Sequence, residues 1–185
     1  FRGGARVAVG DVNGDGVGDV VVAAGLGGGP RVAVFDGTTV RAGSAPQRLI
    51  GDFFAFEQTL RDGAFVAAGD LNGDGFADLV FGGGPGGAPR VLAFDGQALF
   101  GPPAGAGQFV ALTSFFAADS ALRFGIQVAV KNADGDGLGD LVTAAVTLTG
   151  SEVRLILGKD LTPTGGAATT DLDLFQGLTS GVFVG

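Results

Sequence analysis

The sequence predicts an all-β fold made of three repeated units. An acidic nine-residue motif occurs three times, about 60 residues apart, and short valine-rich runs bounded by glycine flank every copy. Glycine supplies 37 of the 185 residues, yet 46% of the chain is hydrophobic, which is more apolar than disordered segments are. We therefore expect short strands packed around an apolar core.

The repeated motif follows the pattern D-x-N-x-D-G-x-x-D. Its copies cover residues 11–19, 70–78 and 132–140. In the third copy Asn132 stands at position 1 and Asp134 at position 3, so every copy still contains three aspartates and one asparagine. The same residue types in the same context indicate one structural role for the three copies.

Each unit is predicted to contain about four short strands. One precedes the acidic motif, two follow it, and a phenylalanine-rich segment closes the unit. In chain order these runs are residues 6–9, 20–23, 30–37 and 52–56, then 65–68, 79–81, 89–96 and 114–117, then 127–130, 141–144, 152–157 and 172–175. No segment carries an apolar stripe of helical period.

The strands carry two further local signals. Apolar residues fill successive positions instead of alternating, so we expect both faces of each strand to be covered. Asp36-Gly37 and Asp95-Gly96 match tight hairpin turns, in which glycine adopts positive φ. A unit of about 60 residues with four short strands has the size of one blade of a β-propeller.

The repeats divide the chain into residues 1–59, 60–121 and 122–177, and a fourth unit is expected to begin in residues 178–185. Propellers close with about four to eight blades. Three blades and one strand do not close a ring, so we expect the chain to be part of a larger or oligomeric propeller. The mid-repeat start and stop favour a longer chain over association of copies.

Composition excludes several classes of function. The chain contains no cysteine and no histidine, which removes thiolate and imidazole chemistry. Its net charge of −8 repels nucleic acid. No apolar run approaches the roughly 20 residues that a membrane helix needs. We therefore expect no enzyme activity, no nucleic-acid partner and no membrane insertion.

The acidic motif matches the coordination chemistry of calcium. Calcium binds six to eight oxygens, and side chains at positions 1, 3 and 5 converge if the backbone winds around one point. The carbonyl of position 7 and the carboxylate of position 9 then close the far side. Magnesium prefers a stricter octahedron, and transition metals prefer ligands that this chain lacks. The alternative is that Asp, Asn and Gly simply form turns.

The unit resembles the FG-GAP repeat of integrin α-subunit propellers and the related VCBS-type repeats. The second copy carries the namesake residues Phe81-Gly82 and Gly87-Ala88-Pro89, whereas the third copy has no such run. The resemblance implies four-stranded antiparallel propeller blades with up to three calcium ions, each held between the first two strands of a blade. The ligands it implies are Asp11, Asn13, Asp15, Val17 and Asp19, then Asp70, Asn72, Asp74, Phe76 and Asp78, then Asn132, Asp134, Asp136, Leu138 and Asp140, with the residue at position 7 contributing its carbonyl.

The function expected from these features is a non-catalytic calcium-binding module for adhesion, scaffolding or protein–protein interaction. Calcium sites of modest affinity fill at the near-millimolar calcium found outside cells, so we expect an extracellular, cell-surface or periplasmic location. The partner is expected to be a protein, a glycan, further blades of the same polypeptide or other subunits of a larger complex. The composition is typical of bacterial proteins.

Two alternatives remain open at this point. One is an accessory or catalytic propeller domain of a secreted enzyme that acts on polysaccharides or phosphoesters, although the carboxylates of Asp52, Glu57 and Asp62 have no defined geometry for such chemistry. The other is a structural subunit of a larger assembly.

Two groups of side chains outside the motif have structural explanations. The phenylalanine pairs at 53–54 and 115–116 recur at the same place in the unit and are expected to pack between blades. Arg31 and Arg90 are expected to order loops at a blade edge.

Overall fold

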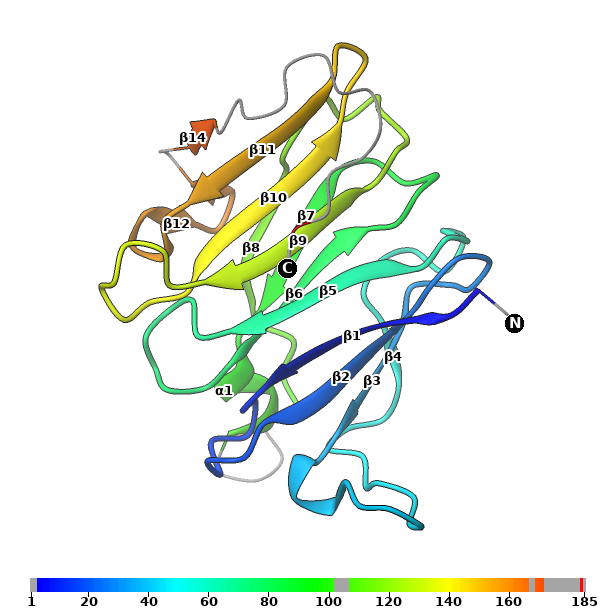
Figure 1. Cartoon of the computed structure of the whole chain (residues 1–185), viewed down its shortest axis with the longest axis vertical. Coiled ribbons are helices and arrows are strands. Elements are labelled where there is room, and N and C mark those ends of the chain that lie inside the picture. The colour runs from blue at the N-terminus through cyan, green and yellow to red at the C-terminus, as the bar shows by residue number, and fades with distance from the viewer. Residues whose placement is uncertain (1–2, 102–106, 167–168, 172–183, 185) are drawn as a thin grey trace.

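The computed structural model describes residues 3–101, 107–166, 169–171 and 184. These residues form three four-stranded antiparallel sheets with almost no helix, which confirms the predicted all-β fold (Figure 1). Each sheet has the meander order of a propeller blade, and the three sheets form an open stack. Among the described residues no helix is long and apolar enough to cross a membrane.

The strands of each sheet follow one another along the chain. The first sheet contains β1 (Ala5–Gly10), β2 (Asp19–Ala24), β3 (Arg31–Phe35) and β4 (Phe53–Phe54). The second contains β5 (Ala64–Gly69), β6 (Asp78–Gly83), β7 (Arg90–Phe94) and β8 (Ala111–Phe116). The third contains β9 (Ile126–Lys131), β10 (Asp140–Val146), β11 (Ser151–Ile156) and β14 (Thr169–Asp171), and the short hairpin of β12 (Leu161–Thr162) and β13 (Gly165–Gly166) lies between β11 and β14 in the chain.

The sheets stack through their first strands. Strand β5 lies between β1 and β9, so the second sheet is covered on both faces (Figure 1). The burial of β6 reflects this position, because all six of its residues are buried. For this strand the expectation that both faces are covered is confirmed.

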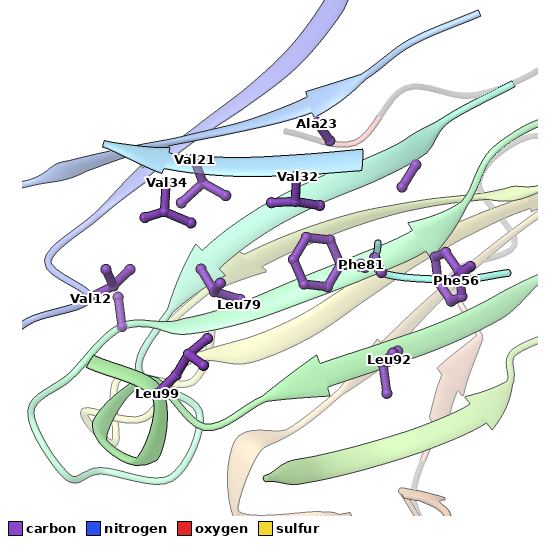
Figure 2. Packing of buried hydrophobic residues seen from close by; sticks show 13 residues of the cluster. Val12, Val21, Ala23, Val32, Val34, Phe56, Leu79, Phe81, Leu92 and Leu99 are labelled. Atoms are coloured by element: carbon purple, nitrogen blue, oxygen red, sulfur yellow. The ribbon is translucent and has the colours of Figure 1, made fainter. Parts of the chain in front are cut away.

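The core is divided into two apolar layers, one on each side of the second sheet. In the first layer Val21 and Val34 of the first sheet face Leu79 of the second (Figure 2). Phe81 is fully buried in this layer, and its ring makes edge-to-face contacts with Phe53 at 6.0 Å and with Phe94 at 6.2 Å between ring centroids. The second layer joins the second and third sheets.

Only one phenylalanine of each pair packs between sheets. Phe53 of β4 contacts Phe81 of the next sheet, whereas Phe54 is exposed. Phe115 packs against the second layer, whereas Phe116 is 51% exposed. The pleat of a strand sends successive side chains to opposite faces, so the expected packing holds for one member of each pair.

The first sheet departs from the expectation that both strand faces are covered. On the face turned away from the second sheet, Val7 is 58% exposed and Val9 is 63% exposed. The prediction is therefore wrong for β1, because among the described strands only its neighbour β2 and the second sheet contact it closely, and no sheet covers this face.

The Asp-Gly pairs do not form hairpin turns. Asp36 caps the 3-10 helix η1 (Gly37–Thr39), and Asp95 caps the α-helix α1 (Gly96–Phe100). Neither Gly37 nor Gly96 adopts positive φ. The hairpin prediction is wrong because Asp is also a preferred helix N-cap, and its carboxylate here accepts backbone N–H groups of the following turn.

The expected phenylalanine-rich segment at 172–175 lies outside the described residues. The expected fourth unit at 178–185 also lies outside them, apart from Val184.

Truncation of Phe81 tests the first apolar layer. We expect Phe81→Ala to lower the free energy of unfolding by about 3–5 kcal/mol, because it leaves a cavity between two sheets. Phe116→Ala is the matched control and is expected to cost less than about 1 kcal/mol, because that ring is largely exposed. Urea denaturation at a fixed calcium concentration measures both values. Equal losses for the two variants would contradict the assigned layer.

Candidate metal centres

The three acidic loops occupy equivalent places in the three sheets. Each connects the first strand of a sheet to the second, so all three lie at the same end of the stack, on the left of Figure 1. The motif copies at 11–19, 70–78 and 132–140 are therefore neighbours in space as well as repeats in sequence.

The backbone of the first loop wraps around the carboxylate of the aspartate at position 1. Asp11 Oδ1 accepts the N–H of Gly14 at 2.8 Å and of Asp15 at 3.1 Å, and its Oδ2 accepts the N–H of Gly16 at 2.8 Å. Gly14 and Gly16 adopt φ of 75° and 85°, which lets the backbone reverse around the carboxylate. In the second loop Asp70 makes the same three contacts.

Positions 3 and 5 contact each other. Asn13 Oδ1 accepts the N–H of Asp15 at 2.9 Å, and Asn13 Nδ2 donates to Asp15 Oδ2 at 3.1 Å. Asp15 Oδ1 accepts the N–H of Val17 at 2.8 Å. Asn72 and Asp74 repeat this arrangement in the second loop.

The aspartate at position 9 ties each loop to a distant turn. Asp19, Asp78 and Asp140 are fully buried. One oxygen of each carboxylate accepts the N–H of the residue at position 2, and the other accepts the N–H of a glycine 18 residues further along the chain. These glycines are Gly37, Gly96 and Gly158, and each bond to them measures 2.9 Å.

Sequence reasoning did not find these three glycines as partners of the motif. Their constant offset of 18 residues from the last aspartate was the available signal. A side chain cannot replace the hydrogen at the first two, because a Cβ would lie 2.0 Å from Gly18 O at Gly37 and 2.2 Å from Ala77 O at Gly96. The close approach of two backbones, and not a hairpin conformation, explains why glycine stands there.

Burial makes ionisation of the position 9 carboxylates costly in the first two loops. Burial raises the pKa of Asp78 to about 7, and the charges of Asp74 and Asp95 act in the same direction. The pKa of Asp19 is also raised, chiefly by burial and in addition by the charges of Asp15 and Asp11. The backbone N–H groups that bind these carboxylates oppose the shift.

Neighbouring loops are joined to each other. Ala77 N–H donates to the carbonyl of Asp11 at 2.7 Å, and Gly139 N–H donates to the carbonyl of Asp70 at 2.5 Å. The side chain at position 7 also covers the glycine at position 4 of the preceding loop: a Cβ at Gly14 would lie 2.5 Å from the ring of Phe76. The loops therefore form a contact between sheets, which the sequence did not reveal.

The first two loops have the donor chemistry of a hard-cation site. All their side-chain ligands are carboxylate or amide oxygens, and the carbonyls of Val17 and Phe76 accept no hydrogen bond from a described residue. In the part of the chain that the structure describes, no lysine or arginine forms an ion pair with a carboxylate of these two loops. A divalent cation would relieve the repulsion among three carboxylates per loop.

The carboxylates are not gathered into a preformed cage. Within the described residues there is no group of three or more acidic side chains close enough together to hold a metal ion. Positions 1, 3 and 5 bind backbone N–H groups of their own loop, and position 9 lies buried beneath it. The ligand roles expected from the sequence therefore remain predictions.

The third loop differs from the other two. Asn132 Oδ1 accepts only the N–H of Gly135, at 2.7 Å. Lys159 Nζ donates to Asp134 Oδ2 at 2.6 Å and lies 3.9 Å from Asp136 Oδ2. This bond lowers the pKa of Asp134 and raises the pKa of Lys159.

The acidic residues considered for glycoside chemistry are not paired with one another. Asp52 forms ion pairs with Arg31 and Arg48. Glu57 pairs with Arg90 at 3.4 Å, and Asp62 Oδ1 accepts the N–H of Gly27 at 3.0 Å.

A family profile matches part of the chain. Residues 11–81 match the family profile described as the FG-GAP-like repeat, a span that begins at the first acidic loop and includes the second. No curated protein matches the chain.

Replacement of Gly96 tests the bond between the loop and the distant turn. We expect Gly96→Ala to lower the free energy of unfolding by about 2–4 kcal/mol, because the added Cβ displaces the turn and deprives the buried Asp78 of a donor. Gly51→Ala is the control, since a Cβ there meets nothing within 4 Å. Urea denaturation in chelator measures both, and a loss at Gly96 no greater than at Gly51 would refute the proposed anchor.

Proposed function

We propose that the chain is a non-catalytic, calcium-stabilised module of stacked propeller blades, because residues 11–81 match the profile of the FG-GAP-like repeat. Its role is adhesion, scaffolding or protein–protein contact at the cell surface or outside the cell. The observation that supports this best is the pair of acidic loops at one end of the stack, whose carboxylates form no ion pair with a lysine or arginine among the described residues.

Calcium is the cation that these two loops suit best. It accepts irregular oxygen geometry and mixed carboxylate, amide and carbonyl ligands. In the first loop Asp11, Asn13 and Asp15 would supply side-chain oxygens, with the carbonyl of Val17. Asp19 accepts one hydrogen bond at each oxygen, which leaves each oxygen a further lone pair.

The loops would convert calcium binding into stability of the whole stack. The N–H of Ala77 in the second loop donates to the carbonyl of Asp11 in the first loop. A conformational change in one loop would therefore alter its contact with the next sheet. Bound calcium would neutralise carboxylates that otherwise repel one another across this junction. A module of this kind is stable where calcium is near millimolar, which favours the space outside the cell.

The acidic groups outside the loops support a non-catalytic role. Asp52 and Glu57 form ion pairs with arginines, and Asp62 accepts a backbone N–H, so each of the three carboxylates has a partner within the fold.

The exposed face of the first sheet supports a partner that is itself a four-stranded repeat sheet. Val7 and Val9 on this face correspond to Val66 and Ala68 of β5, which pack against the first sheet. Val20 and Val22 of β2 are half-buried, whereas the residues that correspond to them in β6 are fully buried. The face therefore fits another repeat sheet, supplied by the same polypeptide or by a second copy.

Thermal unfolding tests the calcium dependence. We expect millimolar calcium to raise Tm relative to chelator, because a ligand that binds only the folded state stabilises it, by about 2.7 kcal/mol at a hundredfold excess over Kd. Asp11→Ala and Asp70→Ala should each reduce this rise, whereas Asp119→Asn, an exposed aspartate outside the loops, should preserve it. A Tm that is the same in calcium and in chelator would contradict the proposal.

Replacement of the exposed valines tests the open face. We expect the wild-type chain to associate above its monomer mass of 18.2 kDa and the double variant Val7→Glu/Val9→Glu to be monomeric, because buried charge opposes sheet stacking. Leu148→Glu adds one charge at an exposed turn of the third sheet and should leave the mass unchanged. Light scattering after size exclusion measures the three proteins. Association that survives the double variant would exclude this face.

A further inference from the structure

Both lysines of the chain lie at the third acidic loop. Lys131 immediately precedes Asn132, and Lys159 follows the third strand of the same sheet. Lys159 Nζ is 2.6 Å from Asp134 Oδ2 and 3.9 Å from Asp136 Oδ2. These are the carboxylates at positions 3 and 5, so the ammonium group lies between two of the expected calcium ligands.

The position of Lys159 is equivalent in all three repeats. Gly37, Gly96 and Gly158 each donate to the buried aspartate of their own loop. The residue that follows this glycine is Thr38 in the first repeat and Gln97 in the second, and both are uncharged. Only the third repeat places a cation there.

At Lys131, which precedes the loop, the third repeat again has a lysine where the other two repeats have an uncharged residue. It pairs with Asp140 in the register of β9 and β10. The corresponding residues Gly10 and Gly69 pair with Asp19 and Asp78 in the other sheets. A second positive charge thus replaces glycine next to the third loop alone.

Position 1 of the third loop has lost its charge. Asp11 and Asp70 each accept three backbone N–H groups through two oxygens. Asn132 accepts one, through its single oxygen, because an amide nitrogen donates and does not accept. The third loop keeps three carboxylates, because Asp134 stands where the other loops have asparagine, but its position 1 offers a single uncharged oxygen.

We propose that the ammonium group of Lys159 takes the place of the metal ion in the third loop, so that the chain binds two calcium ions and not three. The inference rests on the proposed function for the first two loops. It revises the ligand set expected from the sequence. The loop of Asn132, Asp134, Asp136, Leu138 and Asp140 then has part of its negative charge balanced by Lys159 instead of by a metal ion. The third sheet keeps its loop closed irrespective of calcium.

Calcium stoichiometry is the direct test. Equilibrium dialysis against calcium chloride is expected to give two ions per wild-type chain. The double variant Asn132→Asp/Lys159→Gln, which installs the residues of the second repeat, is expected to bind three. Arg123→Gln removes one positive charge from a side chain that contacts only carbonyls of its own turn, and it should leave two. Three ions on the wild-type chain would overturn the inference and leave the proposed function intact.

The reciprocal variant tests whether a lysine after the glycine is sufficient to weaken calcium binding by an acidic loop. Gln97→Lys puts the cation beside the second loop. We expect at least a tenfold loss of calcium affinity at one site, together with a higher Tm in chelator, because the tethered charge relieves the same repulsion. Unchanged affinity and unchanged Tm would overturn the inference.

The chelator measurements separate the two proposals. Lys159→Gln is expected to lower Tm in chelator even if no protein in the series binds calcium. Calcium binding by none of the variants would refute the proposed function and, with it, the count of two ions. A Tm of Lys159→Gln equal to that of the wild type in chelator would refute the role of the lysine itself.

Discussion

The buried carboxylate at position 9 of each acidic loop is the interaction on which the architecture depends. In every sheet it accepts one N–H from the start of the loop and one from the glycine after the third strand, and so joins two segments that the chain separates by 18 residues. A buried carboxylate without these donors is costly. The need for a backbone donor at close range explains both the glycine and the short helical turn that follows Asp36 and Asp95.

All three loops lie at one end of the stack, because each connects the first strand of its sheet to the second. Backbone bonds from Ala77 to Asp11 and from Gly139 to Asp70 link each loop to the preceding one. Repulsion inside one loop therefore affects the contact between sheets. The first two loops and the third then differ in how their charge is balanced, since only the third has a lysine within reach.

Much of the fold could be predicted from the sequence, because its signals are local. Strands flanking an acidic turn follow from valine-rich runs and glycine, and the three copies of the acidic motif give the number of four-stranded sheets. The same local reasoning failed at Asp36-Gly37, where a dipeptide suits both a hairpin and a helix cap. It failed also at Val7 and Val9, because residue type alone does not tell whether a second sheet covers a face.

Residue types at fixed short spacings were enough to predict the all-β repeats and the acidic loops between their first two strands. The groups from distant parts of the chain that contact the loops became known from the folded structure. Gly37, Gly96 and Lys159 reach them through the turn after the third strand. The physical reason is that hydrogen bonds and ion pairs act over a few ångströms of space, and the path of the chain between sheets sets those distances.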